Sequence, residues 1–263
     1  MDYFDELETR SPEVREAALL AALAGQLAHA KAAAPAYAKI LAEVDPAAVT
    51  DRAALASLPV TRKTDLMALQ AASPPFGGLA AQSAAATRLF ASPGPIYEFE
   101  TARPGFWRLE RALFAAGFRA GDIVHNCFAY HLTPGGWMMD GALRSLGCSV
   151  VPGGVGNTEQ QVQAIAHLRP GGYSGTPDFL KVLLDKGAEL GLDCSSITRA
   201  LVSGGALFPA LRQAYAERGV AVLQCYATAD LGLIAYESEA REGMILDEGI
   251  IVEILRPGTG DPL

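Results

Sequence analysis

The middle third of the chain alternates short apolar segments with segments of helical pattern, and each apolar segment runs into a loop of small residues. The five strand candidates are Asp122–Cys127, Cys148–Val151, Gly171–Ser174, Arg199–Val202 and Ala221–Cys225. Short strands that alternate with helices of about a dozen residues are typical of βαβ units and a parallel sheet. We therefore predict an α/β fold with a mostly parallel, doubly wound sheet and flanking helices.

Helix start signals support this pattern. Thr158 with Gln161 has the spacing of a capping box. Thr176 followed by Pro177 is typical of an N-cap and the first helical position. Both helices are expected to direct their N-termini at the loop end of the sheet.

The first hundred residues have a different pattern. Residues 12–33 are rich in Ala and Leu and predict one long amphipathic helix that ends before Pro35. We expect residues 1–104 to form helices and irregular segments packed on the sheet, and residues 105–263 to form the α/β core. At the C-terminus, 250–255 (IIVEIL) has strand character and a turn follows it. An unpaired strand there suggests that the sequence is part of a longer polypeptide.

Composition excludes several classes of function. The formal net charge of −8 repels phosphate backbones, so general binding of nucleic acid is not expected. No apolar run is long enough to cross a bilayer, and the acidic N-terminus lacks the layout of a signal peptide. We expect a cytoplasmic protein without membrane partners. The four cysteines are widely spaced and are expected to be buried, reduced thiols: Cys127, Cys148, Cys194 and Cys225.

The loops after the strands are the place to look for a ligand, because open parallel sheets bind ligands beyond the carboxyl ends of their strands. Tyr130 and His131 follow the first of these strands as a pocket wall or as a pair packed into the loop. Asp230 is a candidate carboxylate for a metal or polar ligand, or a helix cap. His125 is expected to be a satisfied strand histidine.

Four of these segments together resemble a known family. GVGNTEQQ (154–161), GTPDFL (175–180), SGGALFP (203–209) and CYATADLG (225–232), in this order and spacing, are similar to the phenylacetate–CoA ligase group of adenylate-forming enzymes. The resemblance extends to the N-terminal motifs APAYAKIL, LPVTRKTDL and PFG. It implies the large N-terminal domain of an enzyme that activates an aromatic or other carboxylic acid with ATP and Mg²⁺ and transfers the acyl group to coenzyme A.

The resemblance also implies site residues. Gly204, Gly205, Ala206 and Leu207 would lie along the adenine, and Tyr226, Ala227 and Thr228 would follow the nucleotide towards its α-phosphate. Thr228 and Asp230 would be the catalytic residues, with Asp230 reaching Mg²⁺. The residues expected to shape the carboxylate pocket are Tyr130, His131, Gly135, Gly136, Gly153, Gly154 and Asn157.

The chain departs from the family pattern at the phosphate loop. The family has a Ser/Thr/Gly-rich loop that ends in Lys, and this chain has Ser92-Pro93-Gly94-Pro95 followed by Glu98 and Glu100. Two prolines remove amide donors, and the glutamates would repel a triphosphate. The family's ribose-binding Asp, hinge and lid domain with its catalytic lysine would lie beyond residue 263.

Three functions are therefore open. The leading one is activation of a carboxylic acid, with the acid, ATP and CoA as the small-molecule partners. The second is a catalytically impaired relative that binds a small acid, an acyl-CoA or a partner in the same crevice. A Rossmann-type nucleotide-binding enzyme is weaker, because no G-x-G-x-x-G opens a helix after the first strand. A homodimer is also possible on the sequence alone.

Overall fold

The computed structural model describes residues 3–82 and 84–258. Contacts divide the chain into two units, residues 1–84 with 246–263, and residues 85–245. The boundary expected after residue 104 falls within the second of these units. Of the helices in the described ranges, none has both the length and the hydropathy of a membrane span.

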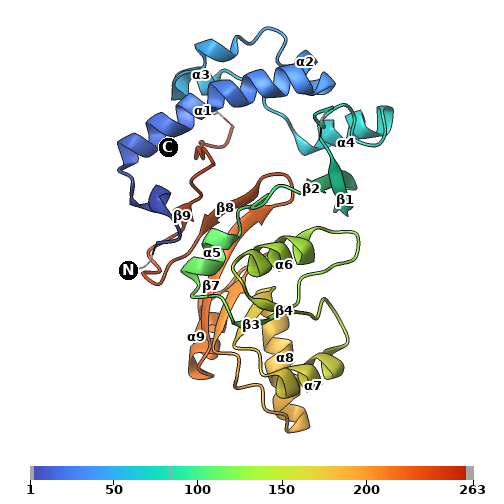
Figure 1. Ribbon diagram of the computed structural model, residues 1–263, viewed down its shortest axis with the longest axis vertical. Coiled ribbons are helices and arrows are strands. Elements are labelled where there is room, and N and C mark those ends of the chain that lie inside the picture. Colours follow the sequence, from blue (N-terminus) through green and yellow to red (C-terminus); the bar gives the residue numbers. More distant parts are fainter. Residues whose placement is uncertain (1–2, 83, 259–263) are drawn as a thin grey trace. The chain divides into compact units, whose positions relative to one another are not determined.

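The first unit is helical (Figure 1). Its elements are η1 (Glu6–Thr9), α1 (Pro12–Ala33), α2 (Pro35–Ile40), η2 (Pro46–Ala48), α3 (Arg52–Ala56) and α4 (Lys63–Ala72). Helix α1 has the predicted bounds, with Ser11 Oγ accepting a hydrogen bond from the backbone N–H of Val14 and Pro12 at the first helical position. Leu27 packs with Leu41 and Val49 in the small core of this unit.

The expected strand over 250–255 is wrong, because 250–254 form no strand. Charged side chains hold this C-terminal segment to the N-terminal helices instead. Arg10 Nη2 lies 2.6 Å from Glu248 Oε2, and Arg52 Nη1 donates to the carbonyl of Val252 at 3.3 Å. The β-branched residues of IIVEIL raise strand propensity, but propensity is a weak guide where tertiary contacts determine the backbone conformation.

The second unit contains the predicted sheet. Its strands are β3 (Ile123–Asn126), β4 (Ser149–Pro152), β5 (Gly172–Gly175), β6 (Arg199–Val202), β7 (Ala221–Thr228), β8 (Gly232–Tyr236) and β9 (Ile245–Leu246). The order is β4-β3-β5-β6-β7-β8-β9. The pairs from β4 to β7 are parallel, and β8 runs antiparallel to β7. The mostly parallel sheet and all five strand candidates are confirmed.

Helices cover both faces of this sheet: α5 (Glu110–Ala115), α6 (Gly135–Ser145), α7 (Thr158–Leu168), α8 (Pro177–Leu190) and α9 (Pro209–Glu217). Because successive strand residues point to opposite faces, each strand contributes to two cores. On one face Val124, Leu201 and Leu223 pack with Leu113 of α5 and Leu143 of α6. On the other, Tyr173, Ala200 and Val222 pack with residues of α7, α8 and α9, namely Val162, Ile165, Leu180, Leu183 and Tyr215.

A hairpin precedes the sheet. Strands β1 (Ala86–Ser92) and β2 (Ile96–Thr101) pair antiparallel, with Ser92 opposite Ile96. The backbone N–H of Ala91 donates to the carbonyl of Leu132 at 2.8 Å, so β1 is joined to the loop that follows β3.

Candidate functional site

The loops that follow β3, β4, β5 and β6 meet at the carboxyl edge of the sheet. A Cβ atom on Gly204 would lie 3.8 Å from Phe128 Cε1 and equally far from Thr176 Cγ2. A Cβ atom on Gly154 would lie 3.8 Å from Tyr130 Cδ2. These distances place the four loops beside one another at this edge of the sheet, as the sheet topology predicts.

Tyr130 is held firmly in the loop after β3. Its hydroxyl accepts a hydrogen bond from Asn126 Nδ2 at 2.7 Å, and its carbonyl accepts one from Trp137 Nε1 at 3.2 Å. The rings of Tyr130 and Trp137 meet edge to face, with centroids 5.2 Å apart. Burial raises the pKa of Tyr130, and the nearby Asp140 adds to this shift, so the phenol is neutral. His131, the next residue, is exposed.

Gly135 and Gly136 begin α6 against this loop. A Cβ atom on Gly136 would lie 2.8 Å from the carbonyl oxygen of Ala129 and 2.8 Å from Tyr130 Cγ. A side chain at this position would therefore displace the loop. Gly136 shapes the crevice by letting the helix approach Tyr130, and the structure shows a packing role for it.

The capping box expected at Thr158 and Gln161 is wrong. The N-cap of α7 is Asn157, in the left-handed conformation with φ 47°, and Thr158 is the first helical residue. Gln161 is buried and turns towards the sheet, where its Oε1 lies 2.8 Å from His125 Nε2. Its Nε2 donates to the carbonyls of Gly154 and Gly156 at 3.1 and 2.6 Å. The sequence signal that could have shown this is the position of Gln161 on the apolar face with Val162 and Ile165.

The four residues expected along the adenine follow β6. Gly204, Gly205 and Ala206 are exposed, while Leu207 is buried in the core with α8 and α9. Gly204 has φ +72°, which favours glycine. Ser203 Oγ donates to the carbonyl of Cys225 at 2.8 Å, so this loop is joined to β7, where Tyr226 and Ala227 continue the strand. Tyr226 is 56% exposed and Ala227 is half-buried.

Thr228 and Asp230 lie at the turn between β7 and β8. Thr228 Oγ1 accepts a hydrogen bond from the backbone N–H of Leu231 at 3.1 Å, and Asp230 is exposed. Trp107 fixes the turn, because its Nε1 donates to the carbonyl of Ala229 at 3.1 Å and its carbonyl accepts from the N–H of Leu233 at 2.8 Å. No contact described for this part of the chain joins Asp230 to the wall formed by Gly154, Tyr130 and Gly204.

At the turn between β7 and β8, Asp230 is the carboxylate considered as a magnesium ligand. The described residues contain no group of three or more His, Cys, Asp or Glu side chains placed for a metal. Mg²⁺ is commonly held by one or two carboxylates together with substrate phosphates, so Asp230 fits the ion only as a ligand of a nucleotide complex.

The residues in place of the phosphate loop form the tip of the β1–β2 hairpin. Pro93, Gly94 and Pro95 are exposed, and Ser92 and Ile96 on either side are buried. Only Gly94 among the three tip residues has a backbone N–H, because proline has none. Glu100 lies 2.5 Å from Arg88 Nη1, so an ion pair offsets its charge. The tip does not fit a triphosphate, which needs several converging amides.

The four cysteines are buried, in agreement with the sequence expectation. Burial raises the pKa of Cys127 and raises that of Cys225 to about 12. Thiols of this kind are protonated and act as small apolar side chains.

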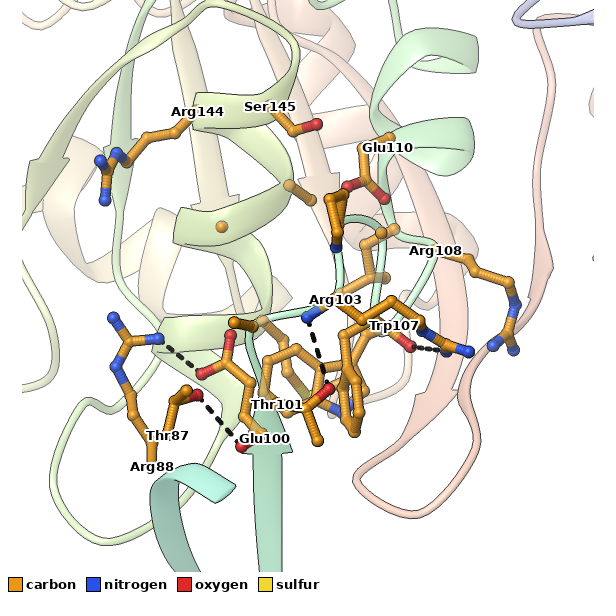
Figure 2. Close-up of a pocket in the computed structure, with 18 residues that line it drawn as sticks. Thr87, Arg88, Glu100, Thr101, Arg103, Trp107, Arg108, Glu110, Arg144 and Ser145 are labelled. Carbon is orange, nitrogen blue, oxygen red and sulfur yellow. Dashed lines mark hydrogen bonds and ion pairs between the residues drawn. The ribbon is translucent and has the colours of Figure 1, made fainter. Parts of the chain in front are cut away.

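A cavity of about 590 Å³ is lined by a different set of residues, and no sequence pattern indicated it. Figure 2 shows its lining, which comes from the hairpin, residues 102–110 and α6. Its arginines are already engaged: Arg88 stacks on Trp137 at 4.4 Å, and Arg103 lies 5.5 Å from the Phe106 ring. Figure 2 shows Arg88 and Arg144 on one side and Arg108 on the other, so these cations do not converge on one point.

Comparison with known proteins gives a consistent picture. No protein-family model matches the chain. It is 30% identical over 284 residues to the phenylacetate-coenzyme A ligase of Thermus thermophilus, covering 100% of this chain and 62% of the relative. It is 28% identical to the ligase of the same name from Escherichia coli, covering 98% of this chain and 62% of the relative. The chain thus spans about 62% of the length of these curated relatives.

Solved structures show the same fold. A 2-hydroxyisobutyryl-CoA ligase in complex with 2-HIB-AMP and CoA in the thioesterification state has a TM-score of 0.86 at 23% identity. The likeness covers 97% of this chain and 58% of that one. A postadenylation-state structure of the ligase has a TM-score of 0.81 at 24% identity, covering 89% of this chain and 54% of that one. The sequence prediction of an adenylate-forming fold is confirmed.

Proposed function

Because this chain is related over its whole length to the phenylacetate-coenzyme A ligases, we propose that it takes part in activating a small, aromatic carboxylic acid as a CoA thioester. The observation that supports the proposal is the proximity of Gly154 to Tyr130, and of Gly204 to Phe128 and Thr176, in the loops that follow four parallel strands. Ligands of open α/β sheets bind at this edge. A cytoplasmic location belongs to the same proposal.

The acid would bind between the loop after β3 and the Gly153–Asn157 loop. Tyr130 offers an aromatic wall whose hydroxyl is fixed by Asn126, and an apolar ring would pack against it. Because even an added Cβ atom on Gly154 would lie only 3.8 Å from the Tyr130 ring, the ring of the acid would lie along Tyr130 and Gly154 and not between them. His131 is exposed and would face the mouth of the crevice.

The nucleotide would bind over β6 and β7. Gly204, Gly205 and Ala206 leave the backbone open to an adenine, and Tyr226 to Thr228 lead towards the turn with Asp230. ATP would supply the adenylyl group, with pyrophosphate as the leaving group, and CoA would then take the acyl group and release AMP. Mg²⁺ would offset phosphate charge beside the Asp230 carboxylate. Thr228 Oγ1 already accepts a bond from Leu231, so its hydroxyl proton is the group left to donate to a phosphate oxygen.

The direct test is calorimetry with phenylacetate and with aliphatic acids of similar size. Preference for phenylacetate supports an aromatic acid site. Replacing Tyr130 with Leu should weaken phenylacetate binding about tenfold through loss of ring stacking. Leu132→Ala is the control, since Leu132 is exposed on the same loop and should leave binding unchanged. Equal binding of all acids to both variants would place the acid elsewhere.

The hairpin tip favours a second candidate, a relative that binds the acid or its acyl-adenylate without forming the adenylate itself. One amide at Gly94 replaces the several donors that a triphosphate needs. Pyrophosphate release by the full-length protein from ATP, Mg²⁺ and a panel of acids separates the two candidates. Acid binding without pyrophosphate selects the second, and pyrophosphate release selects the first.

Binding of Mg²⁺–ATP should be weak and should depend on Asp230, because the hairpin tip contributes few amides. Calorimetry with wild type and Asp230→Ala measures this, and the variant should lose about tenfold or more in affinity. Glu242→Ala is the control for a general loss of negative charge, since Glu242 is also exposed. Tight and equal binding by wild type and Asp230→Ala would show that the phosphates lie elsewhere.

A further inference from the structure

Gln161 makes every hydrogen bond that its side chain can make. Oε1 accepts from His125 Nε2 at 2.8 Å and from Cys127 Sγ at 3.2 Å. Nε2 donates to the carbonyls of Gly154 and Gly156. A glutamine amide has two donors and an oxygen with two lone pairs, so this group is fully used. A buried polar side chain with all its partners is strongly fixed in position.

These partners determine the orientation of the amide. The two carbonyls of the loop require donors, so the NH₂ group faces Gly154 and Gly156 and the oxygen faces β3. His125 Nε2 must then carry the proton, and its Nδ1, which is buried without a hydrogen-bond partner among the described residues, carries none. Burial lowers the pKa of His125, which keeps the ring neutral and keeps this arrangement intact.

The loop lies against this cluster too closely for a side chain. A Cβ atom on Gly153 would lie 2.6 Å from Gln161 Oε1 and 2.7 Å from His125 Nε2. The backbone N–H of Gly154 also donates to the carbonyl of Asn126 at 3.0 Å. The glycine loop is therefore bound to β3 on one side and to Gln161 on the other, while Gly154 contacts Tyr130.

We propose that Gln161 is a positioning residue that holds the Gly153–Asn157 loop against Tyr130 and thereby sets the shape of the acid site. The loop is fixed from the buried side, by a residue of α7 that is itself buried. The part of this inference that concerns acid choice rests on the proposed function, and the part that concerns the loop does not.

The test compares Gln161→Met, Gln161→Glu and Gln163→Met. Methionine keeps the length and volume of Gln161 without its donors, and glutamate keeps an acceptor for His125 but loses both donors to the loop. Gln163 is exposed on the same helix, so Gln163→Met is the matched control. If Gln161→Met does not fold, Gln161→Glu gives the same information.

Hydrogen exchange of peptides covering 151–158 is the first measurement. Loss of the two bonds should raise exchange at the Gly154 amide about tenfold or more in both Gln161 variants, with the control unchanged. The ¹⁵N shifts of His125 should show a protonated Nε2 and a bare Nδ1 in wild type. Unchanged exchange at 151–158 in a folded Gln161→Met protein would overturn the proposal.

The second measurement is the ratio of affinities for phenylacetate and hexanoate. A positioning role predicts that this ratio moves towards one in Gln161→Met, whereas a role in stability alone would lower the unfolding temperature and leave the ratio unchanged. If wild type binds neither acid, the proposed function fails, and the exchange measurement still decides whether Gln161 holds the loop.

Discussion

At the scale of single residues, burial decides the charge of His125. His125 is 1% exposed, its imidazole faces Gln161 and lies close to Gly153, and its pKa is lowered because burial disfavours the charged form. An unfolded histidine has a pKa of about 6.5. Below that pH the unfolded chain takes up a proton that the folded chain resists, so folding loses stability as the pH falls.

We expect the free energy of unfolding to decrease between pH 7 and pH 5, with His125 contributing about 1.4 kcal/mol for each unit by which its pKa is lowered. Denaturant titrations at several pH values measure this. His125→Phe should remove this component, while His167→Phe, on the exposed face of α7, should keep the wild-type pH dependence. Identical pH dependence in wild type and His125→Phe would contradict the assignment.

At the scale of elements, two glycines of α6 occupy opposite environments. Gly136 packs against the loop that carries Tyr130, whereas a Cβ atom on Gly141 would meet no atom within 4 Å. The same substitution should therefore have opposite effects within one helix.

Gly136→Ala should lower the free energy of unfolding by about 1–3 kcal/mol, because the methyl group overpacks the loop. It should also weaken acid binding by moving Tyr130. Gly141→Ala should raise stability by about 0.5–1 kcal/mol, because alanine has less freedom to lose in a helix. Chemical denaturation checks both values, and a neutral Gly136→Ala would show that the loop adapts freely.

Gly232, the first residue of β8, and Gly219, between α9 and β7, form a second matched pair. Gly232 and Gly219 share φ +75°, but a Cβ atom on Gly232 would lie 2.5 Å from the carbonyl oxygen of Trp107 and one on Gly219 would meet nothing. Gly219→Ala should cost about 1 kcal/mol from backbone strain alone. Gly232→Ala should cost about 1–3 kcal/mol more, since Trp107 must move. Equal losses in thermal or chemical unfolding would mean that Trp107 does not confine the turn.

Local patterns in the sequence predicted the elements well where short-range physics controls them. The bounds of α1 and β6 agree with the sequence pattern because Ser11, Pro12 and the apolar run 200–202 act locally. The strand expected over 250–255 and the cap expected at Thr158 failed for a common reason. Partners distant in sequence, Arg52 for Val252 and His125 for Gln161, determine those conformations, and no local pattern reports them.

The candidate site was predictable to a similar degree. The order of parallel strands places Tyr130 and Gly154 on neighbouring strands, so their contact follows from topology. The packing role of Gly136 and the hydrogen bonds from Gln161 to the Gly153–Asn157 loop could not be predicted, because they depend on side-chain positions that only the structure shows. The sequence predicted that the segment in place of the phosphate loop would lose amide donors, but it did not predict a closed hairpin. The ion pair between Glu100 and Arg88 reduces the repulsion of a triphosphate that the sequence suggested.

At the scale of the whole molecule, the chain spans about 62% of the length of its curated relatives. We expect a polypeptide of residues 1–263 to form no phenylacetyl-CoA at a useful rate from phenylacetate, ATP and CoA. The hairpin tip offers a phosphate only the Gly94 amide, and loss of one electrostatic contact in a transition state costs on the order of a hundredfold. Thioester formation measured beside the Thermus thermophilus relative tests this, and comparable rates would contradict it.

Because Ser92 pairs with Ile96, the tip of the hairpin is a position where a new loop could be inserted. The ladder closes below an exposed three-residue tip, and surface tips accept insertions because each doubling of loop length adds only about 0.6 kcal/mol of closure entropy. A Gly/Ser/Thr-rich segment ending in Lys could thus replace Pro93–Pro95 without changing the strands. The backbone N–H of Ala91 also donates to the carbonyl of Leu132, which joins β1 to the loop that carries Tyr130. The inserted segment would therefore lie beside that loop, and the strand pairing below it would already be set.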